Sequence, residues 1–251
     1  MPYWLRLIIV MAATGTVIYV ITGLVQRRVR ADDDPSQTPD VIEYMTMMIG
    51  VVYAIVLGLA IAGAWEARNE AQTVVQNESQ ALHEVAERAQ VFPAADRERI
   101  RRSIDAYAAY VADKEWPEMA AKGQLTDRGD QLFGKVRTAV LRSEPRDELQ
   151  GQAYTPMADQ IALADEARTN RGESAQPTMP PVVWFGLIVG AVVSIGMVFA
   201  LQIRRTAREL TVAMLYCALF AFLLFLIWDM DAPFGRGMAI TPDPFLALRG
   251  R

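Results

Sequence analysis

The sequence predicts an all-α membrane protein with four transmembrane helices in a 2+2 arrangement and a helical extramembrane domain between the second and third spans. Three observations carry this prediction. Two long apolar segments lie near the start of the chain, two lie near its end, and a charged segment separates the pairs. The apolar segments contain almost no charge. Apolar residues in the charged segment recur at helical spacing, and no part of it has the alternation of a strand.

Each apolar segment is long enough to cross a bilayer as a helix. About 20 residues at 1.5 Å rise span a hydrocarbon core of roughly 30 Å. A charge at mid-bilayer costs on the order of 3 kcal/mol, so the scarcity of charge favours membrane spans over buried soluble helices. Arg27 and Arg28 close the first segment where a cleavage site would need small residues, so we expect it to remain as an anchor. The predicted spans are residues 5–25, 44–64, 182–203 and 210–228.

The second span is expected to continue beyond the membrane as one long helix. No glycine or proline occurs between Trp65 and Pro93. Apolar positions in this stretch follow helical steps and form a single stripe. They are Val75, Leu82, Val85, Ala89 and Phe92.

Three more amphipathic helices are predicted before the third span. A turn and N-cap at Pro93 to Asp96 precede the first, and Gly123 ends it. The next begins at about Asp127, and the last covers about residues 146–169. Residues 171–181 contain glycine and three prolines and are expected to be a linker. The predicted division of the chain is 1–43, 44–92, 93–181, 182–228 and a tail of 229–251.

Composition excludes several classes of function. The net charge is −4, and residues 66–178 hold 20 acidic and 15 basic side chains, which argues against a nucleic-acid surface. One histidine rules out histidine-pair metal sites. No nucleophile-elbow, Walker or dinucleotide motif is present, so we predict that the protein is not an enzyme and has no cofactor. Cys217 is the only cysteine, so no intrachain disulfide can form.

The second span carries a stripe of small residues, for which two interpretations stay open. Small residues four apart let another helix approach closely, and a matching stripe of Gly186, Gly190 and Ser194 on the third span favours packing between the two. Alternatively, larger residues on the second span face a pore that gates by dewetting. Both stripes would also serve an oligomer. The candidates for pore lining or helix packing are Met48, Gly50, Val52, Ala54, Ile55, Gly58 and Ala62.

The tail after the fourth span holds a second group of candidate residues. Carboxylates at a helix C-terminus face the negative end of the helix dipole and need compensation. We expect them to accept backbone N–H groups of the following turn; a bound cation or an arginine such as Arg171 are the alternatives. Two carboxylates alone make a poor calcium site. The tail residues are Asp229, Asp231, Pro233, Phe234 and Gly235.

Several of these residues resemble one family. They are Gly50 to Tyr53 before the long helix, Glu115 to Pro117, Arg168 and Arg171, the tail residues and Pro242 to Phe245. The chain is similar to the bacterial bestrophin-like domain family, four-span proteins distantly similar to bestrophin anion channels. The resemblance implies a pentameric channel with an apolar, aromatic neck on the second span and an acidic tail cluster that binds calcium. Here that span has no phenylalanine, and the acidic cluster is reduced to Asp229 and Asp231.

Orientation is predicted differently by two lines of reasoning. Short loops at residues 27–30 and 204–208 each carry three arginines, which predicts that both loops are cytoplasmic and the helical domain external. The resemblance implies the reverse.

The leading prediction is a multi-pass protein of the bacterial inner membrane with bestrophin-like architecture, acting as a homo-oligomeric anion channel. Its partners would be the lipid bilayer, further copies of the chain and small inorganic ions, with calcium as a candidate ligand. The alternative is a non-conducting sensory or scaffolding protein whose helical domain is coupled to the spans through the long helix.

Overall fold

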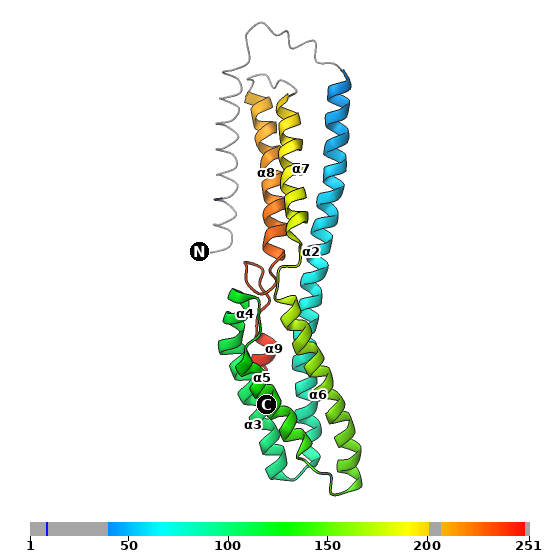
Figure 1. The fold of residues 1–251 in the computed structure, drawn as a ribbon, viewed down its shortest axis with the longest axis vertical. Coiled ribbons are helices and arrows are strands. Elements are labelled where there is room, and N and C mark those ends of the chain that lie inside the picture. Colours follow the sequence, from blue (N-terminus) through cyan, green and yellow to red (C-terminus); the bar gives the residue numbers. More distant parts are fainter. Residues whose placement is uncertain (1–8, 10–39, 201–206, 249–251) are drawn as a thin grey trace. The chain divides into compact units, whose positions relative to one another are not determined.

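The computed structural model describes residues 9, 40–200 and 207–248. The first predicted span, residues 5–25, lies outside the described residues apart from Ile9, and so do Arg27 and Arg28. Every regular element in the described part of the chain is a helix (Figure 1), which confirms the all-α prediction. These elements belong to two compact units. Residues 1–65 and 179–231 form one, here called the apolar unit; residues 66–178 and 232–251 form the other, the helical domain.

The apolar unit contains the first part of α2 (Asp40–Arg88), together with α7 (Pro181–Ala200) and α8 (Ala207–Met230). Two stretches, Tyr44–Val91 and Thr211–Met230, are long and apolar enough to cross a membrane. The apolar part described for α7, Pro181–Met197, is shorter. The structure therefore provides two candidate spans, and the full 2+2 arrangement stays a prediction.

The interior of the apolar unit is small. Side chains from α2, α7 and α8 meet in one apolar cluster, and most other side chains on these helices are exposed. The buried residues of the cluster are Tyr53, Leu57, Leu187, Ala191, Phe220 and Ile227.

The helical domain begins with the second part of α2, which runs without a break from the apolar unit. The further elements are η2 (Ala89–Val91), α3 (Ala94–Tyr110), a π-helical turn η3 (Val111–Glu115), α4 (Trp116–Lys122), α5 (Asp127–Leu141), α6 (Glu148–Ser174) and α9 (Asp243–Leu246). Helices α3 and α5 pack together, and α6 lies beside α2 and α5 (Figure 1).

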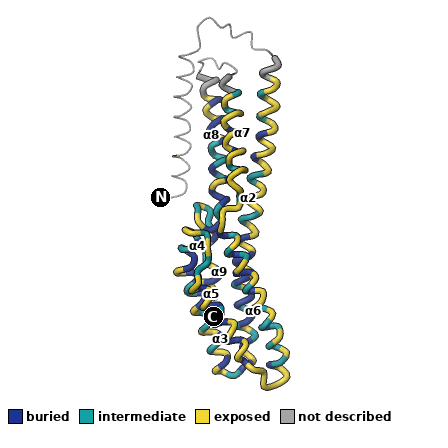
Figure 2. The backbone as a smooth tube through the Cα atoms, in the orientation of Figure 1, coloured by how far each residue is buried: buried dark blue, intermediate teal, exposed yellow. Residues whose placement is uncertain are grey.

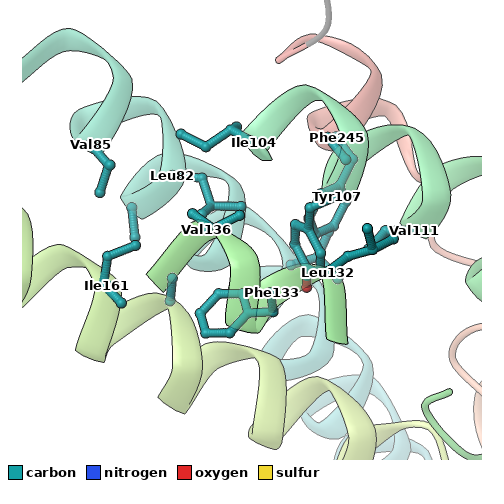
Figure 3. Packing of buried hydrophobic residues seen from close by; sticks show 14 of the residues in the cluster. Leu82, Val85, Ile104, Tyr107, Val111, Leu132, Phe133, Val136, Ile161 and Phe245 are labelled. Carbon is teal, nitrogen blue, oxygen red and sulfur yellow. The ribbon is translucent and has the colours of Figure 1, made fainter. Parts of the chain in front are cut away.

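The domain core is formed by the apolar stripes of these helices. Leu82 and Val85 of α2 meet Ile104 of α3, Val136 of α5 and Ile161 of α6 (Figure 3). All five are buried, so each helix buries one stripe and exposes the opposite side. The residues that helical spacing placed on apolar stripes therefore lie in the interior of the helical domain.

The ends of three helices follow local sequence rules. The Thr126 hydroxyl accepts a hydrogen bond from the Gly129 N–H at the start of α5, and the Asp147 carboxylate accepts one from the Gln150 N–H at the start of α6. Gly123 ends α4 with a φ of 67°, the left-handed conformation that glycine adopts without a steric penalty.

Two local predictions were wrong. Asp96 is not an N-cap: it lies within the first turn of α3, and Pro93 occupies the cap position without a side-chain bond. Helix α6 continues to Ser174, so Arg171 and Gly172 are helical and do not belong to the linker. The extension follows from Arg171, whose buried side chain is held by two carboxylates of the domain.

Candidate functional site

Helix α2 in the apolar unit has two unlike faces. Tyr53, Leu57 and Ala64 form the only fully buried stripe among its described residues between Tyr44 and Trp65. The opposite face is apolar but exposed, as the exposed residues along this part of α2 in Figure 2 show. Steps of four, three and four residues place its members on one side: Met48, Val52, Ile55 and Leu59, with exposed fractions of 59%, 59%, 58% and 69%.

Tyr53 fixes the buried stripe of α2 against its neighbours. Its hydroxyl donates a hydrogen bond to the Leu187 carbonyl at 2.6 Å, and its ring stacks on Phe220 at a centroid distance of 5.2 Å. Gly190 of α7 makes room for this ring, because a Cβ atom at that position would collide with Tyr53. The tyrosine thus joins α2 to both α7 and α8.

The small-residue stripes do not meet as expected. Gly190 faces Tyr53 and not the stripe of α2, Ala54, Gly58 and Ala62 are exposed, and Gly50 is half-buried. A Cβ at Gly58 would have nothing within 4 Å. The predicted contact between the two stripes is therefore not the one formed among the described residues. The reason is that Tyr53, a large side chain with a hydroxyl to satisfy, needs the space that Gly190 leaves.

The tail aspartate Asp231 closes the apolar unit at the end of α8. Its carboxylate is buried and accepts two hydrogen bonds, from the Met179 N–H at 2.8 Å and from the Trp184 indole N–H at 3.1 Å. For Asp231, the expectation that the following turn supplies the donors was wrong, since both come from the chain around the start of α7. Asp229 is buried as well. Asp231 therefore ties the end of α8 to the beginning of α7.

The remaining tail residues belong to the helical domain. Phe234 is buried edge-on against Trp116, with ring centroids 5.4 Å apart. The Pro233 carbonyl accepts a hydrogen bond from the Ile240 N–H at 2.8 Å, and Gly235 lies so close to the Ala120 carbonyl that a Cβ would be 2.7 Å from its oxygen. Pro233, Phe234 and Gly235 are thus packing and turn residues that fix the tail on the helical domain.

The tail is held by two further side chains of the domain. The Trp116 indole N–H donates to the Ile240 carbonyl at 3.2 Å. The Arg68 guanidinium of α2 donates twice to the Met238 carbonyl, at 3.0 and 2.9 Å. Phe245 of α9 is fully buried beside Trp116.

A charge network lies buried in the core of the helical domain. Arg168 of α6 forms a bidentate pair with Glu115 of η3, with N–O distances of 2.8 and 2.9 Å. Arg171, one turn further, pairs with Glu78 of α2 at 2.7 Å and with Glu115 at 3.0 Å. The Tyr107 hydroxyl donates to Glu78. Arg168 also pairs with the exposed Asp130 of α5 at 2.9 Å. Two arginines and three carboxylates thus link four helical elements, α2, η3, α5 and α6.

The network fixes the ionisation of its members. Burial alone would raise the pKa of Glu115, but hydrogen bonds from Arg168 and the charge of Arg171 outweigh it and lower the pKa to about 2. Burial, and then the negative charge of Glu78, raise the pKa of the Tyr107 phenol well above its usual range. The Glu115 carboxylate therefore stays charged and the Tyr107 phenol neutral at physiological pH.

A comparison of the sequence with known protein families finds a match that covers most of the chain. The family described as Bestrophin-like domain matches residues 10–245. The chain belongs to this family.

The bestrophin-like fold is also seen in a solved structure. A bacterial bestrophin homologue from Klebsiella pneumoniae, carrying a mutation, is similar to this chain with a TM-score of 0.69. The match covers 97% of this chain and 96% of that one, at 12% sequence identity, so it shows the fold. Among curated proteins, none matches the chain.

The bestrophin-like family raises the question of calcium at the tail, and the residues present do not fit it. Calcium takes six to eight oxygen ligands. Both carboxylate oxygens of Asp231 already accept hydrogen bonds from the protein. No group of three or more His, Cys, Asp or Glu that could hold a metal ion occurs in the described part of the chain. We therefore assign no step to calcium, and its binding stays a prediction.

Sequence reasoning missed the charge network, although a signal was present. Glu78 falls on the apolar stripe of α2, three residues after Val75 and four before Leu82. A carboxylate at a core position needs a buried cation. The alternative prediction of Arg171 as a partner for the tail carboxylates is wrong, because Glu78 and Glu115 hold its guanidinium.

Proposed function

We propose that this bestrophin-like protein is a homo-oligomeric ion channel of the bacterial inner membrane that conducts anions along α2. Each copy would cross the membrane four times in the 2+2 arrangement, through residues 5–25, 44–64, 182–203 and 210–228. The helical domain would stand on one side of the membrane. The family and the fold support a channel.

The observation that carries the proposal is the uncovered face of α2. In one copy of the chain, Met48, Val52, Ile55 and Leu59 form an exposed apolar face that no other helix among the described residues covers. A contiguous exposed apolar face indicates contact with lipid or with another protein surface. The opposite face is fixed on α7 and α8 by Tyr53. Copies arranged around an axis would turn the uncovered faces toward one another and enclose a pathway.

The residues on this face suit a gate that works by dewetting. Met48, Val52 and Ile55 are apolar, and none of them carries a charged group or a hydrogen-bonding group that holds water firmly. Met48 is unbranched, and Val52 and Ile55 are β-branched. A narrow ring of such side chains excludes water until it widens. Gly50, Ala54, Gly58 and Ala62 would then lie beside the ring, where small side chains allow neighbouring helices to approach closely.

The competing function is a membrane sensory or scaffolding protein that conducts no ions. The uninterrupted helix α2 would suit it, because a helix of 49 residues can pass a shift from the domain into the membrane. The same helix suits gating of a channel. The family and the fold favour the channel.

Stoichiometry and conductance of the purified protein test the proposal. We expect native mass spectrometry in detergent to find a cyclic oligomer, and planar bilayers to show a current whose reversal potential follows the chloride gradient. A stable oligomer without current would leave the scaffolding function. A monomer without current would overturn the channel.

A further inference from the structure

Two ladders of opposite charge run along neighbouring helices of the helical domain. The acidic ladder consists of Asp159, Glu166 and Glu173 on α6, and the basic ladder of Arg128, Lys135 and Arg142 at and beyond α5. In each ladder the residues are seven positions apart. Seven residues are close to two helical turns, so each ladder lies on one face with a repeat of about 10.5 Å. The two repeats match.

The ladders do not pair with each other inside one copy. All six residues are exposed. Two ion pairs join α5 to α6, Arg137 with Asp165 at 2.6 Å and Arg168 with Asp130 at 2.9 Å. All four residues lie on other faces of the helices than the ladders do. Arg128 donates only within α5, to Gln131. In the part of the chain that the structure describes, no ion pair connects the ladders, so both are available to another molecule.

A groove beside the acidic ladder adds an apolar contact area. It lies between α2 and α6, has a volume of about 360 Å³, and includes Glu166 in its lining. Val74, Ala81 and Ala167 form its apolar part, and Leu163 is 52% exposed in it. The rim consists of amide side chains, Asn77, Gln80, Gln160 and Asn170. Small floor residues with an amide rim suit the approach of another helix.

The charges select how a second copy can bind. If the acidic faces of two copies met, as in a two-fold dimer, like charges would repel. A surface of one copy that complements a different surface of the next gives a head-to-tail contact, and such contacts form a ring when the rotation between neighbouring copies closes. We propose that the acidic ladder and the groove of one copy bind the basic ladder of the next copy. This inference rests on the oligomer of the proposed function and names its contact surfaces.

Charge reversal in the full-length protein tests the contact. One variant carries D159K, E166K and E173K, a second carries R128E, K135E and R142E, and a third combines all six. We expect each single-ladder variant to dissociate at a concentration at least about tenfold higher than the natural protein, because attraction at exposed pairs becomes repulsion. The combined variant restores opposite charges and should reassemble. Molar mass in detergent at low salt is measured by light scattering during dilution.

A matched control separates ladder contacts from general charge effects. The variant E98K, E118K and E144K changes net charge as much as the first variant, at two exposed residues and the half-buried Glu118, all outside the ladders. It should assemble normally, and circular dichroism should show that every variant is folded. Single-ladder variants that assemble like this control, or a combined variant that stays dissociated, would overturn the inference but not the channel. A monomeric natural protein would overturn both.

Discussion

The helical domain and the apolar unit differ in how far their charged and apolar side chains find partners within one copy of the chain. In the domain, even charged side chains in the interior have partners: Arg168 and Arg171 are balanced by Glu78 and Glu115. In the apolar unit, α2 buries one narrow stripe and exposes an apolar face. The interior of the domain is satisfied within one copy, whereas the exposed apolar face of α2 suits contact with lipid or with further copies of the chain. The difference places the proposed pore in the apolar unit.

The largest effect is expected from removing the central cation of the domain. Arg171→Met leaves Glu78 and Glu115 close together in the core with only Arg168 to compensate. Breaking a buried ion pair costs about 3 to 5 kcal/mol of unfolding free energy. Chemical denaturation of the full-length protein in detergent measures the loss. Arg88→Met, which removes an exposed pair with Glu84, should cost less than about 1 kcal/mol. Equal losses would show that the network does not hold the domain together.

Acid should weaken the domain through Glu115. Its pKa is lowered to about 2 from an ordinary 4.5, so the stabilisation from the ionised carboxylate is present above pH 4.5 and is lost as the pH falls toward 2. The shift corresponds to about 3 kcal/mol. Unfolding measured across this window should show the loss in the natural protein and a flatter profile in Glu115→Gln. Glu118→Gln, a control at a half-buried residue outside the network, should keep the natural profile.

In the apolar unit, Asp231 should matter through its two donors. Asparagine has one carbonyl oxygen and places an N–H₂ where the carboxylate accepted a hydrogen bond. Asp231→Asn should lower the unfolding free energy by about 2 to 3 kcal/mol, since bonds to a charged group are the stronger kind. The loss should be the same with and without calcium. A thermal shift for Asp231→Asn that appears only with calcium would contradict the tie between α7 and α8.

The smallest expected effect is the difference in stability between alanine substitutions at two glycines of α7. Gly190→Ala would push a methyl group into the Tyr53 ring and should cost at least about 1 kcal/mol. Gly186→Ala meets open space and should be neutral or stabilising by up to about 1 kcal/mol, because alanine favours the helix. Thermal unfolding of the two variants gives the comparison. Identical midpoints would mean that Tyr53 is not packed on Gly190.

Helices could be predicted from repeating patterns in the sequence, whereas contacts between residues far apart in the chain could not. Helical spacing pointed to a helix from about Asp127, where α5 begins, and to one continuous helix from Tyr44 to Phe92, close to α2 and η2. The neighbouring sequence was less informative for a side chain whose hydrogen-bond partner lies far away in the chain. Asp231 finds its donors 47 and 52 residues away, and Arg171 finds Glu78 at a separation of 93 residues. Such pairs leave no periodic trace.

The proposed channel depends most directly on whether α2 borders the ion pathway. Single cysteines at Met48, Val52 and Ile55, in a Cys217→Ala background, can be treated with a charged thiol reagent while the bilayer current is recorded. Leu57, which is buried on the opposite face, is the control. We predict that the reagent reduces the current at the three exposed positions and leaves it unchanged at Leu57. An unchanged current at all four positions would contradict a pathway along this face of α2.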